Sequence, residues 1–171
     1  MDSILVVNYS FTGVSRRAAQ LLCSHHGWPL GTIVEDAPRN GLRCVLDSLL
    51  RRHPAIRYEG PPPGDFRTVV LVSPIWMLRL AGPMRSFARE HRDALQRVAV
   101  VTVMGARGAS NAVAEIAAIL GHPPIAATAF TQGALEDGTA TTPLLAFGEA
   151  LQPGSAATQH AMQPAWTAGR A

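Results

Sequence analysis

The segment of the sequence most suited to chemistry is residues 10–15, which read SFTGVS. An apolar run ends at Asn8 just before this segment, and a helix-like pattern follows it. Three hydroxyl side chains and a glycine therefore fall in one turn between a predicted strand and a predicted helix. Free N–H groups and the helix dipole favour an anion at such a position. The same hydroxyls could cap the helix, so this segment alone leaves an anion site and a capping role equally open.

A second segment, residues 74–87 with the sequence PIWMLRLAGPMRSF, follows the clearest predicted strand. It places Trp76 and Met77 where that strand ends. The flat indole of Trp76 could lie against a flat ligand, and the alternative is that it packs on a neighbouring helix. Two such segments at one edge of a sheet are less expected by chance than either alone.

The sequence lacks the residues that several other kinds of binding site or catalytic site require. The chain has no lysine, which a Walker phosphate loop requires, and it has no G-x-G-x-x-G dinucleotide motif. Cys23 and Cys44 are far apart and form no C-x-x-C, and the six histidines show no zinc spacing. No carboxylate pair or nucleophile stands out. The sequence thus predicts neither a bound metal nor a catalytic side chain.

Composition and charge narrow the class of protein. The 171 residues carry a net charge of +3, and the arginines are scattered rather than gathered in a stripe with aromatic residues. This pattern argues against a nucleic-acid partner. No apolar run reaches the roughly 20 residues of a membrane span, and no signal peptide is recognisable. A cytoplasmic protein is therefore expected.

Apolar runs rich in β-branched residues alternate with helical patterns along the chain. Strands are predicted at residues 4–9, 28–35 (an edge strand), 67–76 (stopped by Pro74), 97–105 and 123–130. Helices are predicted at residues 13–27, 41–53, 82–95, 108–121 and 143–151, and residues 59–66 are predicted to be a loop. This alternation predicts an α/β fold: a three-layer α/β/α sandwich around a five-stranded parallel sheet. Residues 1–152 form one predicted domain, followed by a disordered tail at 153–171.

In parallel sheets of this kind, ligands bind outside the carboxyl ends of the strands, where the strand order reverses. The segments expected to contact a ligand are therefore residues 9–15, 74–82, 104–110 and 131–142.

The two motifs together resemble a known family. Residues 10–15 match the pattern S/T-x-T-G-x-T/S of the flavodoxin-like FMN-binding proteins. Residues 74–87 resemble the pattern P-V-W-A-G-R-P-A-P-P-M-R-x-F of a reductase-like branch of that superfamily. The resemblance covers about residues 3–150. It implies FMN as the cofactor and a sheet with the strand order 2-1-3-4-5.

The resemblance also implies which residues would bind FMN. The phosphate would lie against Ser10, Thr12, Gly13, Val14 and Ser15. The isoalloxazine ring would be bordered by residues 73–78, which include Pro74, Ile75, Trp76, Met77 and Leu78. The other rim would be closed by the segment from Met104 to Gly108, which includes Gly105 and Arg107. Two positions depart from the family: Leu78 replaces a frequent glycine, and Ala106 interrupts a frequent glycine pair.

Three functions are compatible with this resemblance. The first is an FMN-dependent oxidoreductase that passes electrons from NAD(P)H to a quinone-like or other small acceptor. The second is a flavodoxin-type electron carrier that serves a redox partner protein, although such carriers are usually acidic and this chain is basic. The third is a binding or regulatory module that has lost its cofactor, which the changes at Leu78 and Ala106 would permit. A homodimer formed across the flavin edge is an open expectation. If Arg79 and Arg107 reach the flavin, they would favour its reduced anion.

Overall fold

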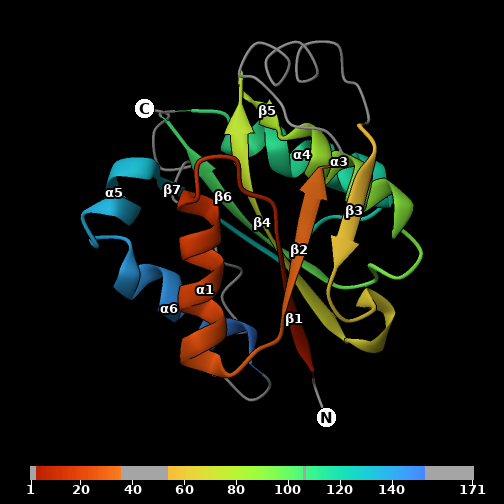
Figure 1. Cartoon of the computed structure of the whole chain (residues 1–171), viewed down its shortest axis with the longest axis horizontal. Helices are drawn as coiled ribbons and strands as arrows, with labels where there is room; N and C mark the ends of the chain where they lie inside the picture. The colour runs from red at the N-terminus through yellow and green to blue at the C-terminus, as the bar shows by residue number, and fades with distance from the viewer. Residues whose placement is uncertain (1–2, 36–53, 106, 153–171) are drawn as a thin grey trace.

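The computed structural model describes residues 3–35, 54–105 and 107–152, and these form a sheet with helices on both faces (Figure 1). The strands are β1 (Ile4–Asn8), β2 (Leu30–Glu35), β3 (Ile56–Glu59), β4 (Thr68–Trp76), β5 (Arg79–Leu80), β6 (Val98–Met104) and β7 (Ala126–Thr131). The helices are α1 (Val14–His26), α3 (Gly82–Glu90), α4 (Ala109–Leu120), α5 (Gln132–Glu136) and α6 (Thr141–Leu151), with a short 3-10 helix at Pro63–Asp65. The predicted helix at 41–53 and the predicted tail at 153–171 lie outside the described residues.

The order of the strands is β3-β2-β1-β4-β6-β7, and β5 pairs with β4. The strands β2, β1, β4, β6 and β7 are mutually parallel. Numbered among themselves along the chain, these five have the expected order 2-1-3-4-5. The expectation of a purely parallel five-stranded sheet is wrong, however, because β3 and β5 add antiparallel pairings to β2 and β4.

The strand β3 also corrects the position of β2, which was expected at the edge of the sheet. β3 pairs with β2 from Thr32↔Glu59 to Glu35↔Ile56 and so covers its outer side. Its residues alternate between half-buried Ile56 and Tyr58 and exposed Arg57 and Glu59. Such alternation is typical of a strand with one face on the core, but a four-residue run is a weak signal.

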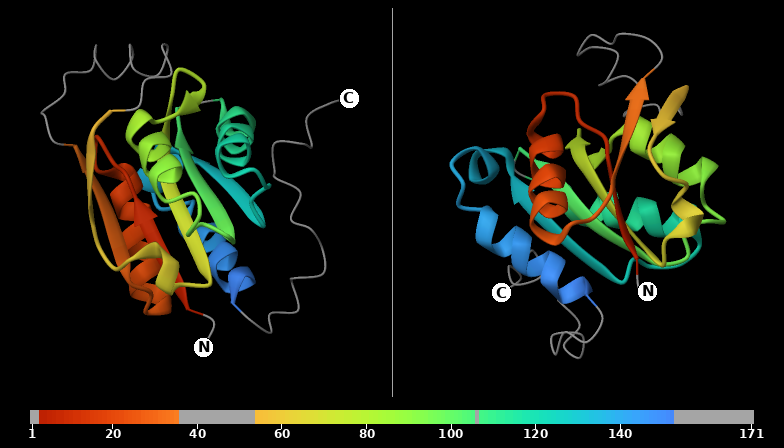
Figure 2. Two further views of the ribbon diagram at one scale, coloured as in Figure 1. Left: turned by 90° about the vertical axis from the view of Figure 1, so that its right-hand side faces the viewer. Right: turned by 60° about the horizontal axis from the view of Figure 1, so that its bottom comes forward.

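Two apolar clusters, one on each face of the sheet, form the core. Alternate residues of β1 point to opposite faces: Leu5 and Val7 join the cluster under α3 and α4, and Ile4 and Val6 join the cluster under α1 and α6. Figure 2 shows the same division of the helices between the two faces. None of the helices in the described ranges has the length and apolar character that a membrane crossing requires.

Pro74 does not end the third parallel strand as expected, since β4 continues to Trp76. β1 pairs with β4 only as far as Val72, so Pro74 has no register partner in β1. Proline, which lacks an N–H donor, is tolerated where a strand has an open edge. The extension carries Ile75 and Trp76 beyond the carboxyl ends of the neighbouring strands.

Candidate functional site

The loop from β1 to α1 leaves the start of the helix without a cap. Ser10 Oγ accepts a hydrogen bond from the Gly13 N–H at 3.0 Å, and no side chain caps α1. Gly13 has φ of 96°, a left-handed conformation that suits glycine. The first bond of the helix runs from the Arg17 N–H to the Gly13 carbonyl. The N–H groups of the three residues after Gly13 therefore have no partner in the described part of the chain.

The charges at this helix end also favour an anion. The first turn of α1 contains no acidic residue, and Arg16 and Arg17 lie within it. Positive side chains are unfavourable at a helix N-terminus, where the dipole is already positive. A bound anion would offset both the positive end of the helix dipole and the charges of the two arginines. The sequence left open a capping role for the hydroxyls of residues 10–15, but no side chain caps α1.

A strained hairpin lies beside this loop. β4 turns into β5 through Met77 and Leu78, between the paired residues Trp76 and Arg79. Met77 has φ of 47° and Leu78 has φ of 63°, the pattern of a type I′ turn, which normally takes Asn or Gly. Both side chains are apolar and exposed, by 58% and 52%. The substitution noted at Leu78 therefore falls where the backbone favours glycine.

Trp76, at the end of β4, packs against two other aromatic rings. Its ring centroid lies 5.6 Å from that of Tyr9 and 5.9 Å from that of Phe11, and both rings are nearly perpendicular to the indole. Tyr9 is buried, and its hydroxyl donates a hydrogen bond to Glu35 at the end of β2. These contacts orient the half-buried indole at the carboxyl edge of the sheet, whereas the alternative interpretation placed it on a helix.

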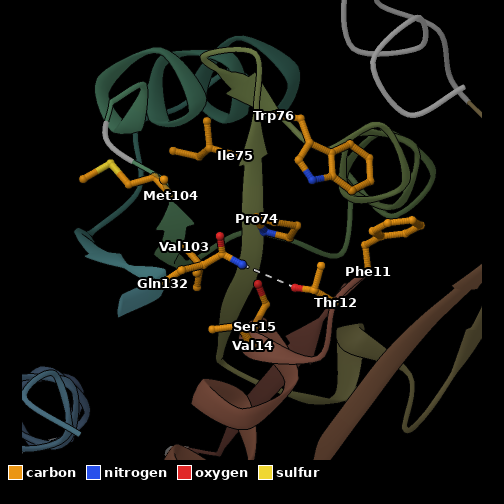
Figure 3. Close-up of a pocket in the computed structure, with 11 residues that line it drawn as sticks. Phe11, Thr12, Val14, Ser15, Pro74, Ile75, Trp76, Val103, Met104 and Gln132 are labelled. Carbon is orange, nitrogen blue, oxygen red and sulfur yellow. Dashed lines mark hydrogen bonds between the residues drawn. The ribbon is translucent and has the colours of Figure 1, made fainter. Parts of the chain in front are cut away.

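A cavity of about 130 Å³ lies between the α1 loop and the ends of β4 and β6 (Figure 3). Among the predicted site residues, those lining it are Thr12, Val14, Ser15, Pro74, Ile75, Trp76 and Gly105. The sequence segments 10–15 and 74–76 are thus brought together. The cavity is smaller than the roughly 300–1,000 Å³ of an enclosed ligand site, so a ligand as large as FMN would extend beyond it.

The remaining predicted residues do not line the cavity. Ser10 and Gly13 shape the loop through their mutual hydrogen bond, and Met77 and Leu78 form the exposed turn above it. Arg107 is exposed and directly precedes Gly108. Gly108 lies against that turn, since a Cβ built on Gly108 would be 2.7 Å from Leu78 Cα. None of these five residues forms the wall of the cavity.

Three lining residues were not among the predicted ones, Phe11, Val103 and Gln132, whereas Met104 belongs to the segment 104–108 that was expected to close the rim. The Gln132 Nε2 donates to Thr12 Oγ1 across the cavity at 3.5 Å (Figure 3). Gln132 begins α5 directly after β7, within the segment 131–142 that the fold pattern indicated. Only its position at a strand end could have signalled it, because an isolated glutamine has no motif.

The lining of the cavity is neutral. It combines apolar side chains with the polar groups of Thr12, Ser15 and Gln132, and it contains no carboxylate. Across the described ranges, no group of three or more His, Cys, Asp or Glu side chains could hold a metal ion. A neutral site with free N–H donors at one end and aromatic residues at the other suits a ligand that carries an anion on a flat, apolar body.

Similarity searches connect the chain to known proteins through its fold. No protein-family model and no curated protein matches the sequence. A flavoprotein from Lactobacillus acidophilus, solved in complex with FMN, aligns with a TM-score of 0.66 at 16% identity, over 81% of this chain and 98% of its own. A flavodoxin, WrbA-like protein from Agrobacterium tumefaciens aligns with a TM-score of 0.52 at 13% identity, over 86% and 96%.

A flavodoxin from the domain Archaea aligns with a TM-score of 0.50 at 14% identity, over 86% of this chain and 96% of its own. Each of these three structures aligns with this chain over nearly its own full length. The chain therefore has a flavodoxin-like fold, and the expectation drawn from the two sequence motifs is confirmed at the level of the fold.

Proposed function

We propose that this protein binds FMN and acts as a redox protein. The observation that carries the proposal is the uncapped start of α1, where free N–H groups and the Ser15 hydroxyl adjoin the same cavity as Trp76. FMN carries a phosphate and a flat ring, the two features that this arrangement can bind. The cofactor bound by the Lactobacillus acidophilus flavoprotein of the same fold supports the same ligand.

The chain's own residues would bind and orient the cofactor. The N–H groups at the start of α1, with Thr12 and Ser15, would donate hydrogen bonds to the phosphate. Trp76, Ile75 and Met104 would give the ring an apolar border that excludes water from one side. When bound, FMN supplies the capacity to accept and donate electrons. No protein side chain is assigned a chemical step.

Binding is tested by titrating the apoprotein with FMN and with riboflavin, which has the ring but no phosphate. We expect Thr12→Ala and Ser15→Ala each to weaken FMN binding at least about tenfold, since a hydrogen bond to a charged group contributes about 1.5–3 kcal/mol. Riboflavin binding should be unchanged in both variants. Ser24→Ala is the matched control, because the Ser24 hydroxyl lies at the other end of α1 and bonds only to Gln20 and Leu21 carbonyls.

Two results would contradict this assignment. Equal losses for FMN and riboflavin in the Thr12 and Ser15 variants would show that the phosphate lies elsewhere. A purified protein without flavin absorbance that also fails to take up added FMN would favour the third function, a cofactor-free binding or regulatory module.

Among redox functions, we propose an oxidoreductase that takes electrons from NAD(P)H and passes them to a quinone-like or other small acceptor. The net charge of +3 supports this choice, because a carrier flavodoxin typically uses an acidic surface to dock on basic partners. NAD(P)H oxidation in the presence of quinones is the test. Bound FMN without turnover of any acceptor would favour the electron carrier.

A further inference from the structure

An ion pair away from the cavity joins the two helices on one face of the sheet. Arg85 Nε of α3 lies 3.1 Å from Glu115 Oε1 of α4, with side chains only 2% and 18% exposed. Burying two charges removes them from water, and the cost often equals or exceeds their attraction. A buried ion pair is therefore weak evidence for a stabilising role. Its contacts with the rest of the fold indicate another role.

Both side chains bind the backbone of the same residue, Leu80. Arg85 Nη2 donates to the Leu80 carbonyl at 2.9 Å, and Glu115 Oε2 accepts from the Leu80 N–H at 3.2 Å. The Leu80 side chain is itself buried. Two helices therefore fix the donor and the acceptor of one residue, which is the second and last residue of β5.

The position of Leu80 determines the position of the strained turn. Leu80 is the register partner of Ile75, which lines the cavity, and only Arg79 separates Leu80 from Leu78. Non-glycine residues with positive φ are unfavourable and persist only where the surrounding structure fixes them. A strand of two residues makes few ladder bonds of its own, so the hydrogen bonds from Arg85 and Glu115 to Leu80 add to that constraint.

We propose that Arg85 and Glu115 are positioning residues that hold the β4–β5 turn, and with it Ile75 and Trp76, in the conformation that binds the flavin ring. This inference rests on the proposed FMN function. The pair therefore acts on the part of the site that would bind the flavin ring, although neither side chain lines the cavity.

The test uses the double variant Arg85→Met/Glu115→Gln. Methionine keeps the length of the arginine stem, and the glutamine oxygen can still accept from the Leu80 N–H, so neither member of the pair is left charged without the other. The matched control is Arg57→Met/Glu59→Gln, which removes an exposed ion pair of 2.9 Å on β3. Both are made in a Trp28→Phe/Trp166→Phe background, where Trp76 is the one remaining tryptophan of the sequence.

Two quantities are measured. In the apoprotein, we expect quenching of Trp76 fluorescence by acrylamide to increase at least twofold in the double variant. In titrations, we expect the affinities for FMN and for riboflavin to fall by the same factor, at least tenfold, because the turn lies on the side of the ring that both flavins share. The β3 control should match its background in both measurements. Arg85→Lys, which keeps the charge but cannot reach both partners, should give an intermediate loss.

The inference is overturned if the double variant keeps both the Trp76 quenching and the riboflavin affinity within twofold of the background. It is also overturned if flavin affinity falls while Trp76 quenching is unchanged, since the turn has then not moved. If the double variant fails to fold, Arg85→Lys decides by the same criteria. A parent protein that binds no flavin refutes the FMN function, whereas the Trp76 measurement on the apoprotein still decides whether the pair holds the turn.

Discussion

Leu78 is one of two non-glycine residues in the described ranges with positive φ, and its side chain is more than half exposed. The left-handed conformation costs a residue with a Cβ about 1–2 kcal/mol. Glycine avoids that cost but adds about 0.4–1 kcal/mol of unfolded-state entropy. The two effects together favour glycine at position 78. Glycine is also frequent at this position in the flavodoxin-like family that the sequence resembles.

We therefore predict that Leu78→Gly raises the free energy of unfolding by about 0.5–1 kcal/mol. Urea denaturation is the measurement. Ile125→Gly is the control: Ile125 is also exposed and has no positive φ, so glycine there should lower stability. A loss of stability in both variants would mean that the Leu78 side chain contributes contacts that outweigh its strain.

Gly108 supports the same turn from the loop after β6. It has φ of 110°, and an added Cβ would lie 2.7 Å from Leu78 Cα and 2.9 Å from Ile75 Cγ2. We predict that Gly108→Ala lowers the free energy of unfolding by about 2 kcal/mol, from strain and the forced shift of the turn together. In thermal denaturation, the control Gly133→Ala should be neutral or slightly stabilising, because no atom lies within 4 Å of the added Cβ. Equal effects at the two glycines would contradict a specific contact with the turn.

At the scale of elements, α5 is the part of the site that comes from farthest along the chain. Its first residue, Gln132, reaches Thr12 across 120 positions of sequence. A phosphate bound at the start of α1 would lie within the region that this side chain crosses, and the amide N–H groups could then donate to it.

We predict that Gln132→Ala weakens FMN binding at least about tenfold, by the loss of one hydrogen bond to a charged group, and leaves riboflavin binding unchanged. The thermal midpoint of the apoprotein should shift little, since the bond to Thr12 is long and exposed. Gln96→Ala is a suitable control because that exposed amide bonds only to the Asp93 carbonyl in the segment before β6. An unchanged FMN affinity would place the phosphate away from α5.

The elements differ in how well their sequences reveal them. The buried strands β1, β4 and β6 are long β-branched apolar runs, which the burial of both sheet faces requires, and all three were predicted. β3 and β5 have four and two residues, too few for a periodicity to stand out. The extension of β4 through Pro74 was missed because it depends on where the neighbouring strand β1 ends.

The candidate site divides in the same way. Thr12, Ser15 and Trp76 belong to contiguous motifs, so the sequence alone singled them out. Gln132 lines the cavity only because the sheet brings the end of β7 beside the α1 loop. No local pattern encodes that proximity, whereas the general rule for the carboxyl edge of parallel sheets indicated the segment to which Gln132 belongs.

At the scale of the whole molecule, three buried or half-buried groups set the pH range of stability. Burial, with a smaller contribution from the charge of His25, lowers the pKa of His26 below its usual 6.5. Burial raises the pKa of Cys23 to about 11 and the pKa of Tyr58 to about 12. Below pH 6.5 the unfolded chain binds a proton at His26 more readily than the folded chain. Above pH 9 the unfolded chain releases protons from Cys23 and then Tyr58 first.

We therefore predict that stability is greatest between about pH 6.5 and 9, and that it is lost on both sides of this window. Urea midpoints at pH 5, 6.5, 8, 9 and 11 provide the measurement. Cys23→Ala should reduce the loss between pH 9 and 11, because the group with the raised pKa is then absent. Midpoints that stay level from pH 8 to 11 would contradict the raised pKa values of Cys23 and Tyr58.

The positive charge of the molecule also has a consequence for a bound flavin. Arg79 and Arg107 lie on the two segments that form the β4–β5 turn and its support. We predict that Arg79→Ala and Arg107→Ala each lower the midpoint potential of bound FMN by about 20 mV, through the lost attraction to the reduced anion. Redox titration is the measurement. Arg92→Ala, in an exposed ion pair with Asp93, is the control, and unchanged potentials in both test variants would show that neither arginine reaches the flavin.

The place of β1 in the sheet has a consequence for how the protein is made. β1 is buried along its whole length, and it pairs with β2 on one side and with β4 on the other. A ribosome completes β4 about 40 residues after β2, which at about 5–20 residues per second leaves roughly 2–8 s between them. During that interval the nascent chain carries an apolar strand with one bare edge. Slower translation of this stretch should lengthen the exposure and raise the fraction of newly made protein that aggregates or binds chaperones.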